Sequence, residues 1–237
     1  MTLAELHRNF DLEMDKSNSI SNYPSFLPEE KDYFFNTTIQ RILKTKYSGD
    51  NVHRTGFQQD QKRSDDLRTV VKTKEYISTD FTTDTEPSCV RYSVSYPIDY
   101  LIGLGETVYI QPIGNTDTTL IKRNDVTECT IENIDGRITD NLSEYHYNRG
   151  YARPLRLYSE NKIYLYTDGT YEITKYIVTY MFMPDKLDWY SGSNTVPLTM
   201  LPEHMWDEIL VYAVKLALQN VSDERLSSYS QETQVIE

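Results

Sequence analysis

The spacing of apolar residues changes twice along this chain, and no other feature of the sequence constrains its fold as strongly. Across residues 154–184, PLRLYSENKIYLYTDGTYEITKYIVTYMFMP, apolar and aromatic side chains occupy nearly every second position. This is the period of a β-strand with one buried face. The turn-forming sequences Ser-Glu-Asn and Asp-Gly divide the stretch. It therefore predicts three consecutive antiparallel strands.

Shorter alternating stretches precede this region. They are CVRYSVSYPI (89–98), ETVYIQPI (106–113) and TECTIENI (127–134). Several short strands separated by turn sequences are typical of a sandwich or a small barrel-like sheet. The chain contains 20 Tyr against 7 Phe and 2 Trp, which fits half-buried sheet surfaces, contact surfaces, or both.

Segments with helical spacing lie on both sides of the β region. Thr2 and Glu5 form a capping-box pattern that opens a helix over residues 2–15. A second helix is predicted over residues 28–46, with a proline in its first turn. After the β region, apolar residues at helical spacing predict a third helix over residues 202–221.

The order of these elements predicts an α+β fold. The N-terminal helices and the C-terminal helix are expected to form a helical core, into which an antiparallel β domain (a sandwich or a small barrel-like sheet) is inserted. We expect N-terminal helices and an extended arm in residues 1–74, the β domain in residues 75–197, and the returning helix with a polar tail in residues 198–237. The polar stretch 48–68 is predicted to be the arm, because long loops in compact domains usually have a role.

The composition limits the function classes. A net charge of −12 argues against a broad phosphate-binding surface, which needs clustered Lys and Arg. Cys89 and Cys129 lack CxxC spacing and are expected to be free, packed thiols. The sequence has no stretch of about 18 apolar residues and no signal-peptide pattern at its start. We therefore expect a soluble protein without membrane contact, assembled in a reducing cytoplasm.

One candidate chemical site lies in LPEHMWDEIL (201–210), where His204 is followed by Asp207 and Glu208. A metal or proton-transfer site is one interpretation, but a zinc-binding helix needs two histidines four residues apart, and this stretch has one. The favoured interpretation is the start of a packing helix, where acids interact well with the helix dipole. The sequence also lacks a dinucleotide-binding glycine pattern, a phosphate-binding loop and a nucleophile elbow. We expect no catalytic residue, no metal, no cofactor and no enzyme activity.

The tyrosines of the β region admit two interpretations. Alternating Tyr is the usual composition of cross-strand pairs, so sheet packing or protein contact is favoured. The other interpretation is a glycan-binding surface that uses Tyr164, Tyr166 and Tyr171.

Four segments carry a resemblance to a known family when they are taken in order. They are YPSFLPEEKDYFFNTTIQRILKTKYSGDN, RSDDLRTVV, KIYLYTDGTYEITKYIVTYMFMPDKLDW and LPEHMWDEILVYAVKLAL. In this order they resemble the neck-ring, or head–tail connector, proteins of tailed bacteriophages, those of crAss-like phages in particular. The resemblance covers about residues 22–226, and the junction from MPD to LPEHMWDEI is its most characteristic part.

The resemblance implies a structural virion protein that docks beneath the portal and forms a ring of about twelve copies around the DNA channel. Its partners would be further copies of itself, the portal protein and neighbouring neck or tail ring proteins. DNA would pass through without sequence-specific binding. The protein would be located in the virion neck after assembly in the host bacterial cytoplasm. The alternative function is a tail-associated β-sandwich module that binds glycans. The candidate inter-subunit or partner contacts are Phe57, Arg68, Tyr164, Tyr166, Arg225 and Tyr229.

Overall fold

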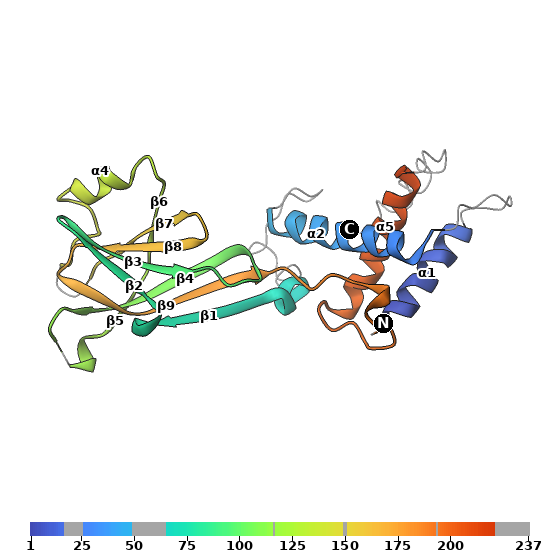
Figure 1. Ribbon diagram of the computed structural model, residues 1–237, viewed down its shortest axis with the longest axis horizontal. Coiled ribbons are helices and arrows are strands. Elements are labelled where there is room, and N and C mark those ends of the chain that lie inside the picture. Colours follow the sequence, from blue (N-terminus) through green and yellow to red (C-terminus); the bar gives the residue numbers. More distant parts are fainter. Residues whose placement is uncertain (17–25, 49–64, 116, 149–150, 193, 221–237) are drawn as a thin grey trace. The chain divides into compact units, whose positions relative to one another are not determined.

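The structure is a computed structural model that divides into two compact units (Figure 1). The helical unit comprises residues 1–70 and 183–237, and the β unit comprises residues 71–182. The predicted α+β fold class is confirmed, with two sheets in a sandwich-like arrangement and no closed barrel in the described part of the chain. The described residues are 1–16, 26–48, 65–115, 117–148, 151–192 and 194–220.

The boundaries of the β unit differ from the expected range of 75–197. The unit begins earlier because Val71 already pairs with Met181 in the sheet. It ends earlier because the chain after Phe182 packs with the helices, where Leu187 forms hydrogen bonds with Asn36. The loop that precedes the last helix therefore belongs to the helical unit.

The helical unit begins at a capping box, as the sequence predicted. The backbone N–H of Thr2 donates to Glu5 Oε2 at 2.8 Å, and the N–H of Glu5 donates to Thr2 Oγ1 at 3.2 Å. Apolar side chains of the long helices form its core, among them the fully buried Leu6, Phe10, Phe35, Leu43, Trp206 and Ile209. The elements of its described part are α1 (Leu3–Lys16), α2 (Pro28–Ser48), η1 (Arg68–Val70), η4 (Trp189–Ser191) and α5 (Glu203–Asn220).

The β unit contains two sheets. One has the strand order β1-β9-β4-β5, formed by β1 (Val71–Ile77), β9 (Tyr171–Phe182), β4 (Tyr100–Pro112) and β5 (Lys122–Asn124). The other has the order β2-β3-β8-β7-β6, formed by β2 (Thr82–Glu86), β3 (Cys89–Ser95), β8 (Lys162–Thr167), β7 (Leu155–Ser159) and β6 (Thr127–Cys129). The paired strands are antiparallel except β6 and β7, which are parallel. Its short helical segments are η2 (Ser78–Asp80), η3 (Thr118–Leu120) and α4 (Ile134–Thr139).

The three strands predicted in residues 154–184 are present, but they do not form one consecutive sheet. β7 pairs with β8, whereas β9 pairs with β1 and β4 in the other sheet. The turn at Asp168 carries the chain from one sheet to the other, with Gly169 at φ +78° and the Asp168 carboxylate accepting the N–H of Thr170 at 2.9 Å. Alternation identifies strands but does not show which sheet each one joins.

Most apolar side chains of the β unit lie in two clusters. Tyr92, Val108, Leu165, Tyr176 and Val178 belong to the cluster between the two sheets. The second cluster lies between the other face of β3, β8 and β7 and the segment that contains α4, and it is formed by Cys89, Cys129, Ile134, Tyr145, Leu155, Leu157 and Tyr166. Both cysteines are buried and free, as expected.

Among the described residues, no helix is long and apolar enough to span a membrane.

Candidate functional site

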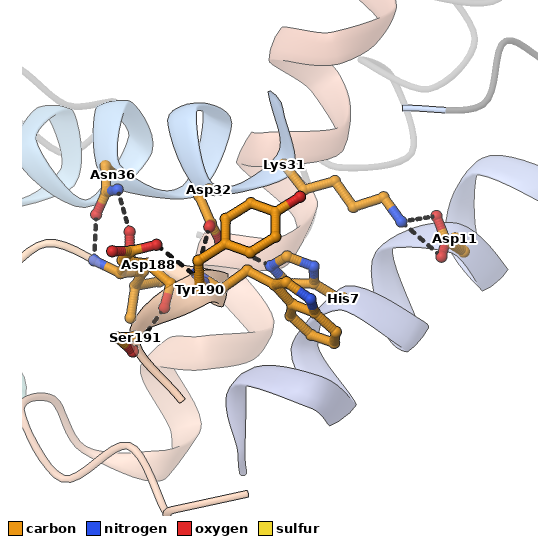
Figure 2. A network of polar contacts seen from close by, with 10 residues as sticks. His7, Asp11, Lys31, Asp32, Asn36, Asp188, Tyr190 and Ser191 are labelled. Atoms are coloured by element: carbon orange, nitrogen blue, oxygen red, sulfur yellow. Dashed lines mark hydrogen bonds and ion pairs between the residues drawn. The ribbon is translucent and has the colours of Figure 1, made fainter. Parts of the chain in front are cut away.

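Three segments of the helical unit meet at the buried side chain of His7 (Figure 2). His7 Nε2 lies 2.8 Å from Asp32 Oδ1, and Asp32 Oδ2 accepts the backbone N–H of Trp189 at 2.7 Å. The indole of Trp189 stacks on the imidazole, with ring centroids 4.6 Å apart. We call His7, Asp32 and Trp189 the His7 network. It connects α1, α2 and η4.

Polar contacts on both sides of this network hold the same segments together. Lys31 Nζ lies 2.6 Å from Asp11 Oδ1, which joins α2 to α1. The side chain of Asn36 accepts the N–H of Leu187 at 2.9 Å and donates to its carbonyl at 3.0 Å. Figure 2 shows these contacts along one side of α2. The chain that returns from the β unit is therefore fixed to α2 at residues 187 and 189.

Burial determines the charge state of His7. Desolvation lowers the pKa of its imidazole, and the opposing effect of the Asp32 carboxylate is smaller. His7 is only 4% exposed, and Phe35 as well as Trp189 packs against its ring. At neutral pH this histidine is an uncharged hydrogen-bonding group within the packing of three segments.

A second network contains four ionisable side chains from α2, α5 and the segment that precedes η1. Lys46 Nζ lies 2.8 Å from Asp66 Oδ2 and 2.8 Å from Glu208 Oε2. The other oxygen of Asp66, Oδ1, lies 2.7 Å from His204 Nε2. Asp66 is 3% exposed, so its carboxylate depends on these partners rather than on water. We call Lys46, Asp66, His204 and Glu208 the Asp66 network.

The pKa shifts in this network follow from its geometry. Burial alone would raise the pKa of Asp66, but the hydrogen bonds from Lys46 and His204 outweigh it and lower the pKa. Burial likewise opposes the charge of Lys46, and the two carboxylates outweigh that effect and raise its pKa. Both groups are therefore charged at neutral pH, and each stabilises the other.

The geometry around His204 argues against the metal-site interpretation. His204 contacts Asp66, Glu208 contacts Lys46, and Asp207 is exposed. The ammonium group of Lys46 lies between the carboxylates of Asp66 and Glu208, and it occupies the place that a metal ion bound by these two carboxylates would take. Within the described ranges, no group of three or more His, Cys, Asp or Glu side chains is arranged to hold a metal ion.

The β unit contains a buried charged group between its sheets. Arg156 Nε of β7 lies 3.1 Å from Glu106 Oε2 of β4, and each side chain is 11% exposed. The Tyr158 hydroxyl donates to the same carboxylate, and the Arg156 guanidinium lies 3.8 Å from the centroid of the Tyr158 ring. Arg156 also pairs with Glu128 at 3.0 Å. Burial, then the charge of Glu106, raises the pKa of Tyr158, so this phenol stays protonated as a donor.

The structure places the predicted contact residues in different environments. Arg68 is exposed in η1 and pairs with Asp65 at 3.1 Å. Tyr164 is half-buried beneath the α4 segment, and Tyr166 is 8% exposed in the same cluster. Tyr166 is therefore packed inside the subunit rather than presented to a partner. Phe57, Arg225 and Tyr229 lie outside the described residues.

The three tyrosines of the glycan interpretation do not share a surface. Tyr164 and Tyr166 face the α4 segment, whereas Tyr171 lies fully buried between the sheets and donates its hydroxyl to the Tyr145 carbonyl at 3.0 Å. A sugar-stacking surface needs exposed rings on one face, and this arrangement does not supply it.

Sequence reasoning missed most of the polar residues that the structure brings together. Asp65 and Asp66 lie near the end of the polar stretch 48–68, which is predicted to be an extended arm; residues 49–64 of that stretch lie outside the described residues, and Asp66 is buried in the helical unit. Glu106 could have been found, because it alternates with Val108 and Ile110 and so faces the sheet interior. Lys46 and His7 gave no comparable signal, since their partners are distant in sequence.

Several large apolar side chains are exposed on both units. In the helical unit they include Leu27, Tyr33 and Tyr190, each more than 60% exposed. In the β unit, Ile98 and Leu142 are almost completely exposed, at 108% and 94%. These side chains lie in loops, in α2 and in η4, and they are candidates for contact with other molecules.

Comparison with protein-family models and with curated protein sequences gives no match for this chain.

Proposed function

We propose that this chain is a structural subunit of a bacteriophage head–tail connector, which forms a ring beneath the portal. The observation that carries the proposal is the insertion of a β unit between two helices of a helical unit. The order of segments that resembles neck-ring proteins implies the same arrangement, a helical core with an added β domain. In this proposal the buried ionisable groups described above have a structural role, since each one joins segments within its own unit.

A closed ring needs two different contact surfaces on each subunit, because neighbours meet head to tail. The exposed apolar side chains offer such surfaces on each unit considered separately. Tyr33 and Tyr190 belong to the helical unit, and Ile98 and Leu142 belong to the β unit. Tyr is enriched at the centres of protein interfaces. Tyr166 is buried and is therefore no longer a candidate for subunit contact, and these exposed residues are the candidates instead.

The charge of the chain fits a position beside passing DNA. With a net charge of −12, the subunit repels the phosphate backbone unless a local basic surface faces it. A channel lined by such subunits would let DNA through without holding it. Partners in this proposal are further copies of the chain, the portal protein and adjacent neck or tail proteins.

Quantitative mass spectrometry of purified virions tests this function. We expect this chain in virions at a constant copy number relative to the portal protein, and we expect it to remain with portal and neck components after the capsid is disrupted. A chain that is missing from virions, or that is lost with the capsid shell, would overturn the proposal.

A further inference from the structure

The β unit is joined to the helical unit by two stretches of chain, and the Asp66 network lies where both of them meet the helices. We call residues 65–70 the outgoing connection and the described part of residues 183–202 the return connection. The outgoing connection contains Asp66, and the return connection leads into the first turns of α5, which contain His204 and Glu208. Both sets of residues are linked through Lys46 of α2.

We propose that the Asp66 network couples the outgoing connection to the start of α5, into which the return connection leads, so that the two connections open as one. Loss of the network would leave the outgoing connection able to move independently of the start of α5. This inference goes beyond the proposed function, since it concerns how the β unit is attached and not what the assembled protein does.

The geometry supports coupling because one carboxylate joins the outgoing connection both to α2 and to the first turn of α5, where the return connection ends. Asp66 uses one oxygen for Lys46, at 2.8 Å, and the other for His204, at 2.7 Å. The Asp66 side chain is only 4% exposed, so water can replace either bond only if this carboxylate first leaves its buried position. If Asp66 moves away, Lys46 keeps Glu208 as a partner but the outgoing connection loses its polar attachment to α2 and α5.

Neighbouring contacts bring the same two connections together. Thr69 Oγ1 of the outgoing connection donates to the carbonyl of Met200 in the return connection, at 3.2 Å. Leu67 and Val70, on either side of Thr69, are fully buried. These contacts lie in the helical unit beside Asp66, so they would be lost together with the network.

The rest of the return connection, before Met200, is held by contacts in which Asp66 takes no part. Asn36 binds Leu187 and Asp32 binds the N–H of Trp189. Residues 194–198 also contact the N-terminal segment, where Ala4 donates to the Asn194 carbonyl at 3.1 Å and Leu198 donates to the Met1 carbonyl at 2.9 Å. The His7 network therefore provides a contrast, because it holds the return connection alone, whereas the Asp66 network holds the outgoing connection to the helix that follows the return connection.

Hydrogen–deuterium exchange on the full chain tests the coupling with Asp66→Asn and its neighbour Asp65→Asn. Asp65 is exposed and pairs only with Arg68 among the described residues. We expect Asp66→Asn to accelerate amide exchange by about tenfold or more in both residues 65–70 and residues 200–208, since a charge-assisted hydrogen bond is lost. Asp65→Asn should change neither segment. Asp32→Asn should accelerate exchange at residues 187–191 and leave residues 65–70 unchanged.

His204→Ala covers the case in which Asp66→Asn fails to fold. The His204 side chain is 55% exposed, so this substitution is tolerated more easily and removes one of the two bonds to Asp66. It should accelerate exchange in residues 65–70 although the substituted residue lies in α5. The proposal is overturned if exchange rises only around the substituted residue. It is equally overturned if all amides of the helical unit accelerate by the same factor, because that pattern means global unfolding.

Discussion

Asp65 and Asp66 show how strongly the environment of a residue depends on contacts that are distant in sequence. Both are acids in the same polar stretch, yet Asp65 is exposed beside Arg68 and Asp66 is 3% exposed between Lys46 and His204. The partners of Asp66 lie 20 and 138 positions away. A pattern confined to neighbouring residues cannot identify such partners, so the polar stretch 48–68 gives no sign that one of its two adjacent acids is buried.

The different burial of the two acids predicts different stabilities. Asp66→Asn should lower the free energy of unfolding of the protein by about 3 kcal/mol, because breaking a buried ion pair leaves the remaining charge poorly compensated. Asp65→Asn should cause no measurable loss, since an exposed pair contributes little. Urea denaturation at pH 7.5, followed by circular dichroism, measures both. Equal losses for the two variants would contradict the burial of Asp66.

The burial of His7 leads us to expect that the protein loses stability in mild acid. Its pKa in the folded protein is lowered by burial from the ordinary value of 6.5, so the unfolded chain binds the proton more readily. Its contribution to stability is therefore present above pH 6.5 and is lost as the pH falls below it. We expect the free energy of unfolding to fall between pH 7.5 and pH 5, and the fall to be smaller in His7→Gln, which keeps a donor for Asp32.

The quantity to compare between the wild type and His7→Gln is the slope of the free energy of unfolding against pH. The absolute values are not comparable, because His7→Gln also loses ring stacking and is less stable at every pH. Identical slopes for the wild type and the variant would show that His7 is not responsible. Asp66, whose pKa is also lowered, adds a second loss that begins only below its ordinary value of 3.8. The two groups are thus separated by their pH windows.

At the scale of secondary-structure elements, the hydrophobic period predicted the long helices closely and the sheet topology incompletely. Helices expected over residues 2–15, 28–46 and 202–221 are observed as Leu3–Lys16, Pro28–Ser48 and Glu203–Asn220. Caps and apolar stripes are local signals, so a single sequence contains them. The crossing between β8 and β9 depends on which strands lie next to each other, and alternation does not determine this.

The ion pair between β4 and β7 predicts a dependence of the β unit on Arg156. Arg156→Met should destabilise the β unit by about 3 kcal/mol, because Glu106 remains buried without its cation. The double variant Glu106→Leu with Arg156→Met should be less destabilised than Arg156→Met alone, since no unpaired charge remains. Thermal unfolding followed at near-ultraviolet wavelengths, where the tyrosines report, measures this.

Arg153→Met is the matched control for Arg156, because Arg153 lies three residues earlier and pairs with the exposed Glu144 at 3.0 Å. Its unfolding temperature should stay close to that of the wild type. A double variant that is less stable than Arg156→Met would contradict the interpretation that uncompensated charge causes the loss.

At the scale of the whole molecule, the inserted β unit and the exposed apolar side chains on both units are the features that the proposed function must explain. Local patterns of the sequence suggested the insertion, since helical spacing frames the β region. They did not identify which aromatic residues are exposed, because Tyr166 and Tyr171 have the same alternation as solvent-facing residues but are packed inside. Sequence period reports which residues share a face, and only the fold shows what covers that face.

Contact residues can be tested in the assembled particle. Tyr33→Ala and Ile98→Ala are exposed substitutions and should leave the unfolding temperature of the isolated chain unchanged. Either should reduce incorporation into virions if its surface contacts a neighbour. Arg8→Ala, on the exposed surface of α1, is the matched control and should leave incorporation at the wild-type level.

Cryo-electron microscopy of the virion neck tests the central claim most directly. We expect density for a closed ring between the portal and the tail, in which each subunit fits the helical unit and the β unit as two bodies and neighbours bury about 800 Å² each. A reconstruction of the neck in which no ring accommodates these two units, or in which this chain occupies another part of the virion, would contradict the account.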